Sequence, residues 1–257
     1  MLAVAGAILA IPGLAVASSG GAGTSSSGSP NVAVQPGNVP VTATSNGITL
    51  DANASAFVRS GVSITGSVPG ADAGDAIEID QLGTAPATSW VRVAIVRAAS
   101  NGSFAAAWHT GRAGQFTIRA VLQANQASSA AASPPAVSVT VYRRSIATLY
   151  GPGFYGARTA CGVVLRRRTV GVANRTLPCG TEVQVYYNGN VATVPVIDRG
   201  PYAHNANWDL TMATGRALGM LGTAVIGAAS TPPTSTPSTS TPPASPAGRG
   251  GGSPSAQ

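Results

Sequence analysis

At 257 residues the chain is long enough for two domains of about 100 residues each, once its ends are discounted. Only 9% of the residues are charged, lysine is absent, and the arginines give the chain a formal net charge of +7. The two histidines and two cysteines show no metal-ligand spacing, so we expect neither a metal site nor a cofactor.

The first 17 residues, Met1 to Ala17, predict a secretory signal peptide. They form an apolar run that ends in Ala15-Val16-Ala17, the pattern of small residues at a signal cleavage site. The run is too short to span a bilayer comfortably, so we expect a secreted, cell-envelope protein with no stable membrane span. No basic residue precedes the run, which leaves an uncleaved N-terminal anchor or a start further upstream as alternatives.

Two stretches of low complexity flank the regions that are patterned as domains. Residues 18–38 are rich in Gly and Ser and predict a flexible linker. Residues 231–257 are rich in Pro, Ser and Thr and predict a disordered tail. The folded domains are therefore expected between residue 39 and residue 230.

Short runs of alternating apolar residues recur between residues 39 and 142. Turn signals such as Pro69-Gly70 and Asn101-Gly102 separate seven of them. Seven strands over about 100 residues predict an immunoglobulin-like β-sandwich. Five arginines match five acids in this region, so we expect a neutral spacer or binding module without catalytic chemistry.

Residues 145–230 predict a second, different β domain. The dipeptide Asn188-Gly189 is a strong hairpin signal between two expected strands, 182–187 and 191–197. The segment "TMATGRALGM" predicts one short helix, with Thr211 as N-cap and Gly219 near the C-cap. Further strands are expected at 146–149, 170–173 and 223–226. The order fits a compact barrel of about six strands with one helix, and the whole chain is expected to be mainly all-β.

Cys161 and Cys179 are the only cysteines and lie 18 residues apart. In an exported chain an even pair at this spacing predicts one disulfide. Closing such a loop would contribute about 3 kcal/mol to stability by the chain-entropy estimate. Two buried free thiols are the alternative.

Four motifs follow one another in the second domain: "ATLYGPGFYGARTACG", "GVANRTLPCGTEVQV", "VPVIDRGPY" and "DLTMATGRALGM". In this order and at these separations they resemble the rare lipoprotein A (RlpA) family, over about a third of the chain. The resemblance implies a six-stranded double-psi β-barrel, a fold shared more distantly with plant expansins and barrel endoglucanases. It also implies action on cell-wall glycans, because several members are lytic transglycosylases that cut peptidoglycan. The paired cysteines together with Asn174 are similar to an actinobacterial-type exported variant.

The resemblance brings one of three proposed catalytic groups to this chain. The acid of the "DRGP" motif is Asp198, whereas the family's Glu falls on Val163 and its His on Asn174. Two hypotheses therefore stand side by side. One is a lytic transglycosylase-like enzyme with Asp198 as general acid and base. The other is a non-catalytic peptidoglycan- or polysaccharide-binding module, or an expansin-like wall-loosening module.

A single acid is compatible with the first hypothesis. Glycoside hydrolysis normally needs two carboxyl groups. In a lytic transglycosylase the sugar's own hydroxyl attacks, so one carboxyl held partly out of water can give and then take a proton. Asp198 ends an apolar strand that runs from Val191, so we expect its carboxyl to be held partly out of water.

Several other residues are candidates for assisting or for binding the glycan. Asp209 could cap the helix or a turn, but its "DL" pair resembles the acid-bearing segment of expansins and barrel endoglucanases. Asn174 can hydrogen-bond a sugar hydroxyl. We expect Glu182 on the solvated surface and His204 in a loop without a role. The remaining candidates are polar or aromatic side chains, which core packing would also explain: Tyr150, Tyr155, Arg199, Tyr202 and Trp208.

The charge of the second domain indicates its partner. Seven arginines stand against three acids between residues 145 and 230. In an exported protein this excess suits peptidoglycan or another anionic cell-wall polysaccharide, although the run Arg166–Arg168 is equally consistent with a solvated loop. We expect no nucleic-acid partner, because no interleaving of aromatic and basic residues occurs.

Overall fold

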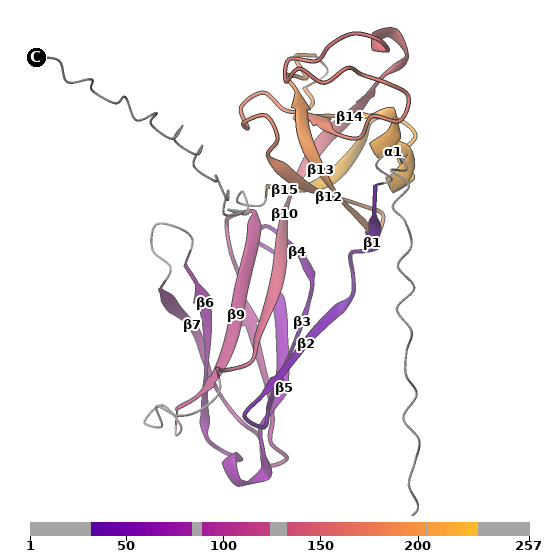
Figure 1. The fold of residues 1–257 in the computed structure, drawn as a ribbon. Helices are drawn as coiled ribbons and strands as arrows, with labels where there is room; N and C mark the ends of the chain where they lie inside the picture. The colour runs from indigo at the N-terminus through magenta and orange to yellow at the C-terminus, as the bar shows by residue number, and fades with distance from the viewer. Residues whose placement is uncertain (1–31, 84–88, 124–132, 204, 231–257) are drawn as a thin grey trace, which may run out of the picture.

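The computed structural model describes residues 32–83, 89–123, 133–203 and 205–230 (Figure 1). The expected signal peptide, the tail of residues 231–257 and His204 lie outside these ranges. Within them, no helix has the length and apolar character needed to cross a membrane. The described chain is built mainly of strands with one α-helix, as expected for an all-β protein.

The first half of the described chain is a two-layer sandwich. One sheet has the strand order β2-β3-β5-β8, and the facing sheet continues from β10 through β9 and β6 to β7. Leu50 and Ile64 of the first sheet pack against Ile79 and Ile118 of the second, and all four are fully buried. The strands are β2 (Pro40–Ser45), β3 (Ile48–Asn53), β4 (Ser55–Phe57), β5 (Val62–Ser67), β6 (Ala76–Leu82), β7 (Trp90–Arg97), β8 (Ser103–Trp108), β9 (Gly114–Leu122) and β10 (Ala136–Tyr150).

All seven strands that we expected in this region are present, and β2 and β4 are additional. β9 follows the alternation that predicted it, because Phe116, Ile118 and Ala120 point into the core and the residues between them do not. The two layers confirm a β-sandwich. Its assignment as immunoglobulin-like stays a prediction.

The second half is a closed barrel of six strands. Its order is β14-β11-β13-β12-β15-β10, and parallel pairing of β10 with β14 closes the ring. A second parallel pair, β11 with β13, makes the sheet mixed, as a double-psi barrel requires. Valines fill the interior, among them Val172, Val183, Val185 and Val194. The strands are β11 (Val172–Ala173), β12 (Glu182–Tyr187), β13 (Asn190–Asp198), β14 (Trp208–Thr211) and β15 (Ala224–Ser230).

The barrel's helix α1 (Met212–Leu218) has the predicted caps. The Thr211 side chain accepts a hydrogen bond from the Thr214 N–H, and Gly219 ends the helix in the left-handed conformation. β14, which precedes the helix, was not expected, because four residues are too few to show an alternating pattern. Asp209 therefore lies inside a strand, and its interpretation as a helix or turn cap is wrong.

One long strand joins the sandwich to the barrel. β10 pairs with β9 over residues 136–141, with β15 over residues 143–147 and with β14 over residues 147–150 (Figure 1). The short strand β1 (Val34–Pro36) also pairs with β13 of the barrel. The prediction of a flexible linker over residues 18–38 is therefore wrong for residues 34–36. A three-residue run beside Gly and Pro carries no readable strand pattern. The domain division at residues 142 and 145 falls within β10 and remains a proposal.

Gly171, just before β11, is expected to be a position of the barrel that is sensitive to an added methyl group. Its φ is +155°, and a Cβ there would lie 2.6 Å from Cγ1 of the buried Ile197. Gly171→Ala should therefore lower the free energy of unfolding by about 2–4 kcal/mol, measured by urea denaturation. The control is Gly222→Ala, where a Cβ meets nothing within 4 Å. Equal stability of the two variants would contradict this account.

Candidate functional site

Two acids and a tyrosine meet at one end of the barrel. Asp198 is the last residue of β13, Asp209 lies in β14, and Ala173 of β11 is the register partner of both. The two acids thus flank the end of β11. Tyr150, the last residue of β10, is electrostatically coupled to both carboxylates. Strands that are far apart in sequence therefore bring together three of the predicted site residues.

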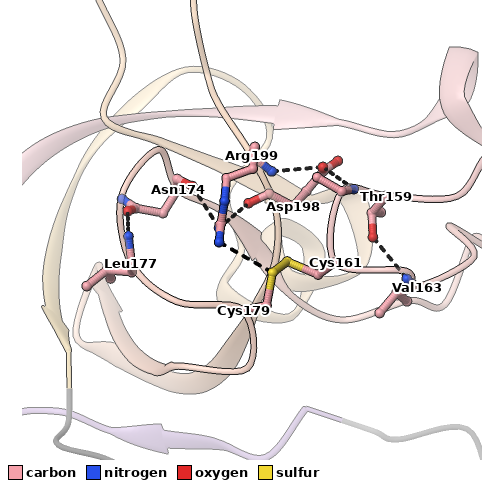
Figure 2. Close-up of a disulfide and its surroundings, with 9 residues drawn as sticks. Thr159, Cys161, Val163, Asn174, Leu177, Cys179, Asp198 and Arg199 are labelled. Atoms are coloured by element: carbon pink, nitrogen blue, oxygen red, sulfur yellow. Dashed lines mark hydrogen bonds between the residues drawn. A yellow bond between two sulfur atoms is a disulfide. The ribbon is translucent and has the colours of Figure 1, made fainter.

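The Asp198 carboxylate is held by one of its oxygens. The peptide N–H groups of Ala160 and Arg199 donate to Oδ1 at 2.9 and 2.8 Å (Figure 2). Among the described residues no hydrogen bond reaches Oδ2, and the side chain is partly buried. One oxygen is therefore oriented by the backbone while the other remains available to a ligand.

Arg199 holds loops together and leaves the Asp198 carboxylate unneutralised. Its guanidinium donates to the carbonyl oxygen of Asn174 at 3.3 Å, and lies 3.4 Å from Sγ of Cys179 (Figure 2). In the described part of the chain the only ion pairs are Arg92–Glu78 and Arg119–Asp80, both in the sandwich. The Arg199 guanidinium is thus engaged within the protein, which weakens its prediction as a glycan ligand.

Asn174, which we expected at the position of the family's His, has a structural task. Its Oδ1 accepts hydrogen bonds from the N–H groups of Thr176 and Leu177 at 3.1 and 2.9 Å, which closes a tight turn. Its Nδ2 makes a long contact of 3.5 Å to the carbonyl oxygen of Asn207. Because Oδ1 is engaged in the turn, the amide nitrogen is the part of the side chain left to donate to a sugar.

Val163, which we expected at the position of the family's Glu, ends the tip of the loop beside Asp198. Its N–H donates to Oγ1 of Thr159 at 3.1 Å, and its side chain is 36% exposed. An exposed valine at this place supplies no group that can transfer a proton. The acid–base capacity of the site therefore rests on Asp198 and Asp209.

A disulfide between Cys161 and Cys179 is formed, so the predicted pairing is confirmed. It joins the loop tip of residues 159–163 to the loop that leads into β12 (Figure 2). Ala160, the neighbour of Cys161, is the residue whose N–H donates to Asp198. The disulfide consequently fixes a loop that orients the central carboxylate.

The second acid, Asp209, has a pKa above the ordinary value of an aspartate. Burial raises the pKa of Asp209, a hydrogen bond from Thr148 Oγ1 at 2.8 Å opposes this, and the nearby Asp198 carboxylate raises it further. Burial, followed by Asp198 and Asp209, also raises the pKa of the Tyr150 hydroxyl, so that the phenol stays protonated. This hydroxyl is buried and has no hydrogen-bond partner among the described residues. The sequence offered no signal that Thr148 would donate to Asp209, because a threonine in a strand is common.

The aromatic candidates separate by exposure. Trp208 is only 8% exposed and packs in the barrel core, so core packing explains it. Tyr202 is 81% exposed beside the "DRGP" turn, and Tyr155 is partly buried with Arg167 over its ring. Phe154, which sequence analysis missed, is 60% exposed and makes an edge contact with Tyr150. Two exposed rings therefore lie close in sequence to the cluster: Tyr202 follows Asp198 by four residues, and Phe154 follows Tyr150 by four residues.

Asp209→Asn is expected to change how stability depends on pH. A carboxyl whose pKa is higher in the folded state than in the unfolded state loses stabilisation as pH rises above its ordinary value near 4. The neutral amide avoids this loss, so the variant's free energy of unfolding relative to wild type should increase from about pH 4 to pH 8. Urea denaturation at a series of pH values measures it. Parallel pH profiles for the two proteins would refute the assignment.

Comparison with known proteins points to the same region. A family model described as "Lytic transglycolase" matches residues 142–229. The "Probable endolytic peptidoglycan transglycosylase RlpA" of Aquifex aeolicus is 40% identical over 87 residues, which are 33% of this chain and 38% of that protein. The "Endolytic peptidoglycan transglycosylase RlpA" of Campylobacter jejuni is 35% identical over 97 residues, 36% of this chain and 35% of that protein. The chain thus spans less than two fifths of the length of either relative.

Among solved structures, the Streptomyces papain inhibitor is 25% identical over 35% of this chain and 93% of its own, with a TM-score of 0.29. A score at this level supports no inference about fold or activity. The family model and the relatives, in contrast, cover the segment that forms the closed six-stranded barrel. Residues 142–229 of this chain therefore belong to the RlpA-like double-psi β-barrel family.

Proposed function

We propose that the barrel acts on peptidoglycan glycan strands as a lytic transglycosylase-like enzyme. The observation that supports this best is the pair of carboxyl groups beside β11. Asp198 has one oxygen held by two N–H groups and one oxygen without a partner among the described residues. Asp209 has a raised pKa, which extends the pH range over which it can supply a proton.

The proposed reaction uses both groups and no water. Protonated Asp209 donates its proton to the glycosidic oxygen as the bond from that oxygen to C1 of the muramyl residue breaks. The C6 hydroxyl of the same residue attacks C1, and Oδ2 of Asp198 takes the hydroxyl proton. The products are a free C4 hydroxyl on one fragment and a 1,6-anhydromuramyl end on the other. Proton exchange with solvent then returns both carboxyl groups to their starting states.

The setting of the barrel supports a wall substrate. The relatives of this region are named for endolytic action on peptidoglycan. A disulfide is typical of proteins outside the cytoplasm, which supports the expected export to the cell envelope. No described arginine of the barrel forms an ion pair, so its positive charge is available to carboxylates of the wall.

A binding-only or wall-loosening module is the second candidate, and one observation favours it. The positions to which the resemblance assigns the family's Glu and His hold an exposed valine and an asparagine that closes a turn. In that case Asp198 would accept hydrogen bonds from sugar hydroxyls and move no proton. The arginine-rich barrel would still hold the wall polymer.

Incubating the full chain with isolated peptidoglycan separates the two candidates. The enzyme hypothesis predicts soluble fragments with 1,6-anhydromuramyl ends, identified by mass spectrometry. The binding hypothesis predicts co-sedimentation with the wall and no such fragments over the same time. Supernatant of wall incubated with heat-unfolded protein serves as the blank.

A further inference from the structure

A cavity lies where the sandwich meets the barrel. Its volume is about 390 Å³, within the range of small-ligand sites. The sandwich contributes Ala113 from the β8–β9 connection, and the central strand β10 contributes Arg143 and Ser145. The barrel contributes the loop of residues 174–177 and the end of β15 at Ser230. Both halves of the protein therefore border it, the sandwich through one residue.

The two walls of this junction cavity are held at a fixed separation. β10 passes through both sheets without interruption. Across the junction the Tyr142 hydroxyl donates to Oε1 of Gln184 at 3.0 Å, and the Phe57 ring lies 5.4 Å from that of Tyr186. The cavity is thus a feature of one packed unit rather than a gap between two tethered domains.

The charged lining of the cavity is basic only. Arg143 and Arg175 line it, and no carboxylate does. Arg175 is oriented, because its guanidinium donates to the carbonyl oxygens of Pro201, at 2.7 Å, and Ala206. The guanidinium of Arg143 forms no hydrogen bond or ion pair within the described part of the chain. The described lining thus carries two positive charges and no negative charge, and guanidinium groups pair readily with carboxylates.

One residue borders both the cavity and the acid site. Asn174 lines the cavity, and its peptide N–H donates to the carbonyl oxygen of Asp198 at 3.2 Å. Trp208, in the cavity wall, directly precedes Asp209 in β14, although neither Asp198 nor Asp209 lines the cavity. The cavity therefore neighbours the acid site without including it, and a polymer long enough to reach both would pass Asn174.

We propose that the junction cavity is a subsite for a carboxylate of the wall polymer, in which Arg143 pairs with the carboxylate beside Arg175. This inference rests on the proposed function, since it places a muramyl residue next to the acid site. Two sources share the chemistry: the lactyl carboxylate of a glycan without peptides, and the carboxylates of a stem peptide. The sandwich then contributes to substrate selection through its share of the cavity.

Binding measurements on the Asp198→Asn chain, which is expected not to cleave, test the subsite. The probes for calorimetry are peptide-free glycan fragments, disaccharide-peptide fragments, and chitooligosaccharides, which lack carboxylates. Arg143→Gln should weaken binding of a carboxylate probe about 10- to 100-fold and leave chitooligosaccharide binding unchanged. The probe more strongly affected identifies the source of the carboxylate. Arg168→Gln removes the same charge from an exposed residue outside the cavity and should change binding less than about threefold.

Two results would overturn the subsite. Arg143→Gln and Arg168→Gln could weaken all probes equally, which would indicate general charge attraction. Carboxylate probes could also bind no more tightly than chitooligosaccharides. Release of anhydro fragments by the chain with Asp198 intact is measured separately. A chain that discriminates carboxylates through Arg143 but releases no fragments supports the subsite and contradicts the proposed enzyme, so the two failures are distinct.

Discussion

Replacing Asp198 with asparagine is expected to lower the rate of anhydro-fragment release about 100- to 10,000-fold, since general acid–base groups contribute on this scale. The amide oxygen can still accept the hydrogen bonds from Ala160 and Arg199, so the site geometry should persist. What the variant lacks is an oxygen basic enough to take the proton of the attacking hydroxyl. Fragment release is followed by mass spectrometry under conditions where wild type is linear in time.

Glu182→Gln is the matched control for Asp198→Asn. It removes one negative charge from an exposed position at the start of β12, a strand that pairs with neither β11 nor β14. We expect it to retain activity within about threefold of wild type, because long-range charge effects at the surface are screened by salt. Binding of Asp198→Asn to the wall should also persist. Equal rates for Asp198→Asn and wild type would remove Asp198 from the mechanism.

The second large effect is expected from the disulfide. Replacing Cys161 and Cys179 together with serine opens an 18-residue link and should lower the free energy of unfolding by about 3 kcal/mol. The loss of activity should be greater than unfolding explains, because the loop tip that carries Ala160 is no longer fixed against Asp198. A displacement of about 1 Å at a reacting group can cost about 100-fold in rate.

To test the disulfide prediction, the activity of the serine variant is compared with that of another destabilised variant under conditions where both are folded. Ile226→Ala lowers stability by opening a cavity in the barrel core, and Ile226 lies in β15, which pairs with β10 and β12 and not with the strands of Asp198 and Asp209. Both variants are assayed at a temperature where circular dichroism shows each to be folded. The serine variant should then be about 10- to 100-fold slower than Ile226→Ala. If the two variants have the same activity, the disulfide serves stability alone and has no positioning role.

Sequence patterns predicted most of the barrel because its local signals are strong. The Asn188-Gly189 turn joins β12 and β13 as expected, and the Thr211 and Gly219 caps bound α1. The missed strands, β1 and β14, have three and four residues and pair with partners distant in sequence. Their stability comes from these long-range pairings, which leave no local pattern.

The candidate site was only partly predictable for a related reason. Asp198 stands in a conspicuous motif, and Asp209 could be suggested from the resemblance alone. The orientation of Asp198 depends on the peptide N–H of Ala160, and any residue type has such a group. The raised pKa of Asp209 depends on burial against Thr148 and Asp198, which is a property of the assembled barrel. The junction cavity likewise exists only because β10 is shared by two sheets.

The origin of the oxygen at the new glycan ends tests the central claim most directly. Peptidoglycan is digested with the full chain in water enriched in ¹⁸O, and the released fragments are examined by mass spectrometry. If Asp198 and Asp209 promote attack by the muramyl C6 hydroxyl, the fragments carry 1,6-anhydro ends and contain no ¹⁸O. Fragments with ¹⁸O at a reducing end, or wall that binds the protein and releases no fragments, would contradict the account.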